Sequence, residues 1–182
     1  MSMVGVSDFK YALLTADTPE GVTYGEWTRI PSLNKISVNP SSNTATNYGD
    51  NGPVESAESL GEVSISADIC DIPDKDRAAL LGHKLVNGVM EYNSEDVAPY
   101  AAIMFTGLNS NGTRKFVKVL KVKFSEPKDE YTTKEDKVTF SNPQIEGKAV
   151  IREYDKAWKR TLDEGAEGVT PEIVSKFTET VE

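Results

Sequence analysis

Between residues 62 and 69 apolar and polar side chains alternate without interruption, and this pattern constrains the fold more than any other feature of the chain. Val63, Ile65, Ala67 and Ile69 share one parity, while acidic and serine side chains occupy the other. A period of two places each set on its own face of a β-strand, one buried and one in solvent. We therefore predict a half-buried strand here, within a larger sheet.

Further segments with strand patterns recur along the chain. They lie at residues 9–13, 36–38, 138–140, 145–154 and 157–162, the last two flanking an Asp155-Lys156 turn. Pro40 is expected to end the strand at 36–38, because proline supplies no donor to a ladder. The longest pair, 100–106 and 114–124, is separated by turn-forming residues and is predicted to form a hairpin.

The second strand of that hairpin changes phase along its length. Val117 and Val119 share one parity, whereas Leu120, Val122 and Phe124 share the other. A β-bulge adds one residue to a strand and so returns later side chains to the same face. We predict a bulge near Leu120.

Two segments carry helical signals. Residues 71–82 have Pro73 near the first position, acids in the first turn and Gly82 as a stop. The segment 170–182 begins with a Thr170 cap and a proline, and apolar residues then recur on one face. Together the patterns predict a mainly β fold: a β-sandwich or partly open barrel with one short mid-chain helix and a C-terminal helix.

Residues 39–60 have no apolar period and are rich in Asn, Ser, Thr, Gly and Pro, with turn chemistry at Asn51-Gly52-Pro53. We predict a long loop here. Loops of this length inside a compact domain are commonly binding elements, so the segment is a candidate contact surface. An ordinary mobile loop is the alternative.

The totals favour one folded domain over residues 1–182. The formal net charge of -9 makes phosphate-rich partners poor candidates for tight binding. Cys70 is the single cysteine, so an intrachain disulfide is not possible and a reducing compartment is expected. The N-terminus has no signal-peptide pattern, and the apolar runs are too short for a membrane-spanning helix. We expect neither secretion nor membrane insertion.

The usual chemical motifs are missing. His83 is the single histidine and Cys70 the single cysteine, so the sequence cannot supply the paired His and Cys ligands of a zinc site. We expect no metal, cofactor or catalytic residue. His83 follows the helix stop and is expected to satisfy the last carbonyls. Asp74 and Asp76 are interpreted as first-turn acids facing the helix dipole, since an EF-hand register is absent; weak cation sites stay open.

A basic run stands out in this acidic protein, at Arg114, Lys115, Lys118, Lys121 and Lys123. A strip for nucleic acid is one interpretation. Lysines on a strand more often form a solvated face or protect an edge, and stacking aromatics are not interleaved with them after Leu120. An electrostatic match to an acidic loop of a neighbouring subunit is a further hypothesis.

Four stretches, taken in order, carry a resemblance to a known family. They are residues 71–83, the region from 99–105 through 123–127, residues 130–147, and the closing region 158–181. In these stretches the chain resembles the major tail proteins of long-tailed bacteriophages that infect Gram-positive hosts. The specificity of the match lies in the order and coverage of the stretches rather than in any catalytic motif.

The resemblance implies the phage tail tube fold, in which β-sandwich subunits close into hexameric rings that stack into a tube. Genomic DNA would pass through that tube at ejection without specific binding. The implied partners are other copies of the chain and the tape measure, terminator and distal tail proteins, with no membrane. The implied location is the tail of the virion, and the host cytoplasm before assembly.

Within that picture, residues 39–58 and 125–136 are predicted to make the contacts between subunits, because both are long, polar and poor in core residues. The candidate contact residues are Asn47, Tyr48, Asp50, Asn51, Glu55, Glu58, Lys118, Lys121, Lys123, Lys128 and Tyr131. Alternatives are the tube of a contractile tail or phage-like particle, a tail terminator, and a glycan-binding β-sandwich. An enzyme is disfavoured, since convergent titratable groups are not evident.

Overall fold

The structure is a computed structural model that describes residues 2–49, 52–128 and 144–181, with the backbone alone at 45–49 and 52–57. Its elements, in chain order, are β1 (Met3–Thr18), β2 (Gly21–Tyr24), β3 (Thr28–Ile30), β4 (Leu33–Gly49), β5 (Gly52–Ile69), α1 (Asp74–Leu81), β6 (Lys84–Val86), β7 (Val89–Glu91), β8 (Tyr100–Asn109), β9 (Arg114–Ser125), β10 (Gln144–Ala149), β11 (Lys159–Asp163) and α2 (Pro171–Glu179). The prediction of a mainly β fold with two helices is confirmed for these residues.

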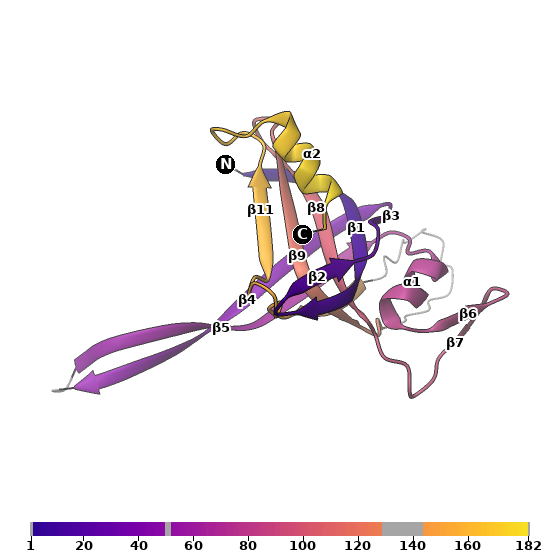
Figure 1. Cartoon of the computed structure of the whole chain (residues 1–182), viewed down its shortest axis with the longest axis horizontal. Coiled ribbons are helices and arrows are strands. Elements are labelled where there is room, and N and C mark those ends of the chain that lie inside the picture. The colour runs from indigo at the N-terminus through magenta and orange to yellow at the C-terminus, as the bar shows by residue number, and fades with distance from the viewer. Residues whose placement is uncertain (1, 50–51, 129–143, 182) are drawn as a thin grey trace, which may run out of the picture.

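Nine of the strands in the described residues form one antiparallel sheet in the order β2-β1-β8-β9-β10-β5-β4, with β3 paired to β1 and β11 paired to β9 (Figure 1). The sheet branches at β9, since β11 pairs with its residues 115–119 and β10 with its residues 122–125. The predicted hairpin of 100–106 with 114–124 is confirmed as β8 and β9. A separate two-stranded sheet joins β6 to β7.

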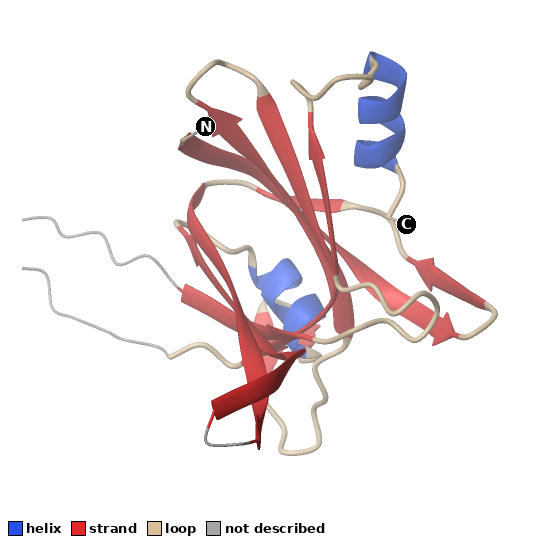
Figure 2. Ribbon diagram, turned by 90° about the vertical axis from the view of Figure 1, so that its left-hand side faces the viewer, coloured by secondary structure: helices blue, strands red, loops and turns tan. Residues whose placement is uncertain are grey.

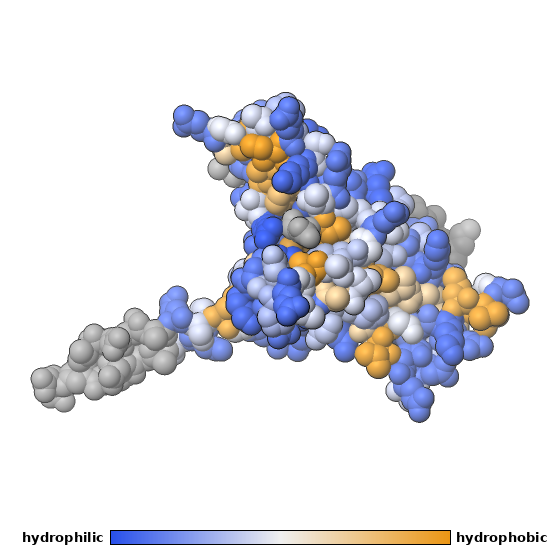
Figure 3. Space-filling view, viewed as in Figure 1, coloured by the Kyte–Doolittle hydropathy of each residue, from blue (hydrophilic) through white to orange (hydrophobic). Residues whose placement is uncertain are grey.

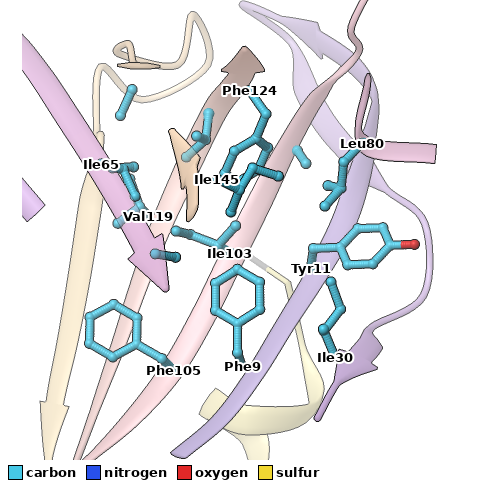
Figure 4. Packing of buried hydrophobic residues seen from close by; sticks show 14 of the residues in the cluster. Phe9, Tyr11, Ile30, Ile65, Leu80, Ile103, Phe105, Val119, Phe124 and Ile145 are labelled. Atoms are coloured by element: carbon cyan, nitrogen blue, oxygen red, sulfur yellow. The ribbon is translucent and has the colours of Figure 1, made fainter. Parts of the chain in front are cut away.

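The core lies on one face of this sheet, where apolar side chains from β1, β5, β8, β9 and β10 converge (Figure 4). Phe9, Ile65, Ile103, Val119 and Ile145 are each at most 2% exposed. The alternation predicted over 62–69 is confirmed, because all four of its apolar side chains are buried. The hydrophobic burial of this face is the main source of the fold's stability.

The bulge predicted near Leu120 is confirmed. Ala101 faces Val122 and Ile103 faces Val119, so two steps along β8 match three steps along β9. The extra residue returns Val122 and Phe124 to the core face.

The two helices lie on different sides of the long strands (Figure 2). Helix α1 places Leu80 and Leu81 in the core, and Gly82 ends it in the left-handed conformation at φ 79°. Helix α2 has Thr170 as its cap, with the Thr170 hydroxyl accepting a hydrogen bond from the Ile173 N–H. Both helices were predicted, although α1 is shorter than the segment 71–82.

The loop predicted over residues 39–60 is wrong. β4 and β5 stay paired from Leu33 with Ile69 out to Gly49 with Gly52, so the segment forms a long antiparallel hairpin. Pro40 does not end β4, because β4 is an edge strand, where a missing donor is tolerated, and the register shifts between Pro40 and Ser42. The apolar period is absent here because the hairpin leaves the core, not because strand structure stops.

The two strands predicted on either side of the Asp155-Lys156 turn are confirmed in part. β10 ends at Ala149 rather than at residue 154, β11 spans Lys159–Asp163, and both strands pair with β9. The segment between β10 and β11 contains an ion pair, in which Nη2 of the buried Arg152 lies 2.6 Å from Asp155 Oδ2. The predicted strand at 138–140 lies outside the described residues.

Candidate assembly surfaces

The paired strands β4 and β5 project from the body of the molecule as an arm (Figure 1). We use "the arm" for residues 41–49 and 52–60. Its described side chains, at 41–44 and 58–60, are exposed, and Leu60 is 44% exposed. Between Lys35 and Lys75 the sequence contains no basic residue, so the arm is acidic. The described side chains of the arm therefore bury little surface within the chain.

The arm carries four of the eleven contact residues predicted from the sequence. Asn47, Tyr48 and Glu55 lie on its paired strands, where Asn47 faces Glu55. Glu58 is exposed and faces Thr44. Asp50, Asn51 and Tyr131 lie outside the described residues.

Lys118 is buried, so the interpretation of a solvated lysine face is wrong for this residue. Its side chain has no exposed surface, and its Nζ donates a hydrogen bond of 2.6 Å to the Thr180 carbonyl. The ammonium lies 4.1 Å from the centre of the Phe177 ring. Burial, together with the positive charges of Arg160 and Arg152, lowers the pKa of Lys118 to about 8. Lys118 therefore holds the C-terminal segment in this chain.

Lys121 is also occupied within the chain. Its Nζ lies 2.7 Å from Asp17 Oδ2, and the Asp17 side chain is 5% exposed. Burial raises the pKa of Asp17, but the hydrogen bonds from Lys121 and from the N–H groups of Glu153 and Tyr154 outweigh it and lower the pKa. The pair ties β1 and β9 to the connection that follows β10.

The remaining lysine candidates are more accessible. Lys123 is half-buried, with its ammonium 5.8 Å from the centre of the Tyr100 ring. Lys128 is exposed near the end of the described segment. The four predicted lysines therefore differ in exposure: Lys118 is buried, Lys121 and Lys123 are half-buried, and Lys128 is exposed.

Helix α2 is held without a buried residue of its own. The Thr180 carbonyl after its last turn accepts hydrogen bonds from Lys118 Nζ and, at 3.4 Å, from Trp27 Nε1. Ile173 remains 45% exposed. The attachment of α2 thus rests on polar contacts at its C-terminal end and on the ring of Phe177.

An exposed apolar hairpin, β6–β7, was not foreseen from the sequence. Val86 and Val89 flank its turn and are 52% and 62% exposed, and orange side chains gather over this end of the molecule in Figure 3. Asn87 and Gly88 have φ angles of 51° and 79°, as a type I′ turn requires. The signal was present as Asn-Gly between valines, although the strands are only three residues each.

The side chain of His83 does not satisfy the last carbonyls of α1, contrary to the prediction; the backbone N–H of His83 bonds the Ala78 carbonyl instead. Its ring lies between Asp96 and Glu126. Asp74 and Asp76 lie in the first turn of α1 as predicted, and Asp76 also accepts a hydrogen bond of 2.9 Å from the Tyr11 hydroxyl.

Within the described residues, no group of three or more His, Cys, Asp or Glu side chains is arranged to hold a metal ion. Among the same residues, neither helix is long and apolar enough to cross a membrane.

Comparison with protein-family models finds no match, and comparison with curated proteins finds none. Among solved structures, the chain is similar to one in the cryo-EM structure of the anti-feeding prophage (AFP) baseplate, 6-fold symmetrised. The TM-score is 0.38 and the identity 11%, over 91% of this chain and 100% of that chain. A similarity at this level carries no argument about function.

Proposed function

We propose that the chain is a structural, non-enzymatic protein of a bacteriophage tail, whose copies form hexameric rings that stack into the tail tube. The tube would conduct genomic DNA at ejection, and the tape measure, terminator and distal tail proteins would be its other partners. The proposal starts from the resemblance of four ordered sequence stretches to major tail proteins. One structural observation, the projecting arm, carries it further.

The low stability of an isolated hairpin suggests that the arm packs against a partner. An isolated two-stranded hairpin is marginally stable at best in water, because ordering each residue costs about 1–2 kcal/mol of conformational entropy. The described side chains of the arm are exposed and so contribute little burial to offset that cost. Packing against a second subunit would supply the missing burial.

The arm also has the reach to make such a contact. The pairing runs from Ser42 with Leu60 to Gly49 with Gly52. At a rise of about 3.3 Å per residue this is roughly 25 Å of ribbon, more than the 10 Å thickness of a packed sheet pair. A contact between the arm of one copy and the body of the next is heterologous, and heterologous contacts build rings and stacks.

The charge of the chain fits a conduit. A net charge of -9 disfavours retention of a polyanion, so DNA could pass without being held. An acidic arm would favour a neutral or basic surface on the next copy. Lys123, which is half-buried, and Lys128, which is exposed, are the candidate residues of that surface.

The test removes the arm without disturbing the sheet. Residues 43–59 are replaced by Asn-Gly, which closes a type I′ turn between the paired residues Ser42 and Leu60. We expect the variant to fold, with an unchanged far-ultraviolet circular dichroism shape, and to form no tubes in negative-stain electron microscopy. Normal tubes from this variant would contradict the role of the arm.

A charge-reversal pair gives a finer test. Glu55→Lys with Glu58→Lys changes the arm, while Glu20→Lys with Glu167→Lys makes the same charge change at exposed positions elsewhere. We expect the first pair to impair tube formation and the second to leave it unchanged. Equal effects of the two pairs would mean that net charge, not the arm, governs assembly.

A further inference from the structure

A second cluster, unrelated to the arm, centres on His83. Its Nδ1 lies 2.7 Å from Asp96 Oδ2, and its Nε2 lies 2.8 Å from Glu126 Oε2. Asp96 belongs to the connection between β7 and β8, and Glu126 directly follows β9. The imidazole, at the end of α1, therefore joins three parts of the chain. Its side chain is 9% exposed.

The chemistry of this arrangement requires a charged ring. A neutral imidazole carries one N–H, whereas an ionised carboxylate can only accept hydrogen bonds. Both contacts can form together with ionised carboxylates only when both ring nitrogens are protonated. In agreement, the hydrogen bonds to Asp96 and then Glu126 raise the pKa of His83 above its ordinary value, although burial opposes them. The same contact lowers the pKa of Asp96.

We propose that His83 is a proton-operated clasp, which ties residues 84–98 and the end of β9 to α1 while both ring nitrogens are protonated and loses one of these two ties when one proton is lost. The segment it restrains contains the exposed apolar hairpin β6–β7, which has no ladder to the main sheet among the residues that the structure describes. The clasp thus sets the position of an apolar surface. This inference does not depend on the proposed function.

The surrounding charges keep the histidine as the group that switches. From α1, Arg77 Nη2 lies 3.4 Å from Glu126 Oε1, and from β6 the charge of Lys84 acts on Asp96. Arg77 and Lys84 thus place positive charge beside the two carboxylates that contact the ring. The Tyr92 ring packs against the imidazole, with the ring centroids 4.5 Å apart and the planes at 57°.

The sign of the pH response follows from the raised pKa. A group whose pKa is higher in the folded state stabilises that state fully below its unfolded value, here 6.5. The contribution is lost as the pH rises through the folded value. The clasp is therefore closed at mildly acidic pH and opens on the alkaline side of 6.5.

Because the chain has one histidine, nuclear magnetic resonance can follow the clasp without assignment ambiguity. The ¹⁵N shifts of the two ring nitrogens are recorded from pH 5 to 9.5, together with the backbone amide shifts of Asn93 and Asp96. The Asn93 amide donates to Asp96 Oδ2 at 2.9 Å and so reports on the connection. We expect a ring midpoint above 6.5 and amide shifts that change with the same midpoint.

Two variants separate the clasp from a general pH effect. Glu126→Gln removes the negative charge of one acceptor at a residue whose side chain is 48% exposed, so folding should be retained, and it should lower the ring midpoint. Glu62→Gln removes the remote, exposed pair with Lys148 and should leave the midpoint unchanged. His83→Gln should make the two amide shifts independent of pH near that midpoint.

Two results would overturn the proposal. One is a ring midpoint at or below 6.5 in the unmodified protein, which would mean that the two carboxylates do not hold the charged ring. The other is a set of amide shifts in residues 84–98 that ignores the titration of the ring.

Discussion

Replacing the buried Lys118 by methionine should stabilise the protein. Methionine keeps the length of the apolar stem and removes the charge that burial penalises. The pKa of Lys118 is about 8 in the folded chain against an ordinary value of 10.5. At about 1.4 kcal/mol per pH unit, the gap corresponds to about 3 kcal/mol of cost for holding the charged form at pH 7. That value is an upper bound, because the variant also loses the hydrogen bond to Thr180 and the contact with Phe177.

The pH dependence gives the sharper signature. Since the folded pKa of Lys118 is the lower one, the unfolded chain binds more protons between pH 8 and 10.5, and stability rises with pH across that window. The advantage of Lys118→Met over the unmodified chain should therefore shrink from pH 8 to 10.5. Taking the difference between the two proteins cancels other titrations, including that of Tyr11.

The assay is urea unfolding at low protein concentration, followed by circular dichroism at pH 7, 8.5 and 10. Lys123→Met on the same strand is the control, and we expect it to change the free energy of unfolding by less than about 0.5 kcal/mol. Two results would refute the reasoning: a Lys118→Met variant that is less stable at pH 7, and an advantage that stays constant up to pH 10.

Two further stability predictions use the same assay. Tyr11→Phe removes the hydroxyl that donates to Asp76, a buried carboxylate, and should cost about 2 kcal/mol; an unchanged midpoint would mean that water replaces the hydroxyl. Gly82→Ala should cost more than about 2 kcal/mol, because φ is +79° and an added Cβ would lie 2.3 Å from the Val97 carbonyl oxygen. The matched control Gly88→Ala has the same φ but open space, so it should cost about 1 kcal/mol, and equal losses would remove the steric argument.

The sequence predicted best those elements whose side chains form the core. The alternation at 62–69, the β8–β9 hairpin and the bulge near Leu120 all follow from which side chains must face inward. Turn and cap residues placed both helices, because Gly82 and Thr170 act through local backbone geometry. These are effects of short range or of simple period.

What the sequence could not predict lies away from the core or depends on long-range contacts. The arm has no apolar period, and its described side chains, at 41–44 and 58–60, are exposed, so in the sequence its polar strands look like a polar loop. The burial of Lys118 depends on the C-terminal segment 62 residues away, which supplies the carbonyl it binds. The pairing of Lys121 with Asp17 spans 104 residues. A run of lysines on one strand gives no sign of either partner.

The contact residues divide in the same way. Glu58 and the arm positions keep their predicted role as candidates, since they are exposed or lie on a projecting ribbon. Lys118 and Lys121 are weaker candidates for contacts between subunits. Reversal of either charge would break contacts inside one chain as well as any contact between chains. A block in assembly by Lys118→Glu would therefore not identify an interface.

The central claim is assembly into a tube, and the most direct measurement is negative-stain electron microscopy of the purified protein across a concentration series, with sizing chromatography alongside. The account predicts hollow tubes or rings of uniform width for the unmodified chain, and loss of tubes when residues 43–59 are replaced by Asn-Gly. A protein that stays monomeric at every concentration, or an arm-less variant that forms the same tubes, would contradict it.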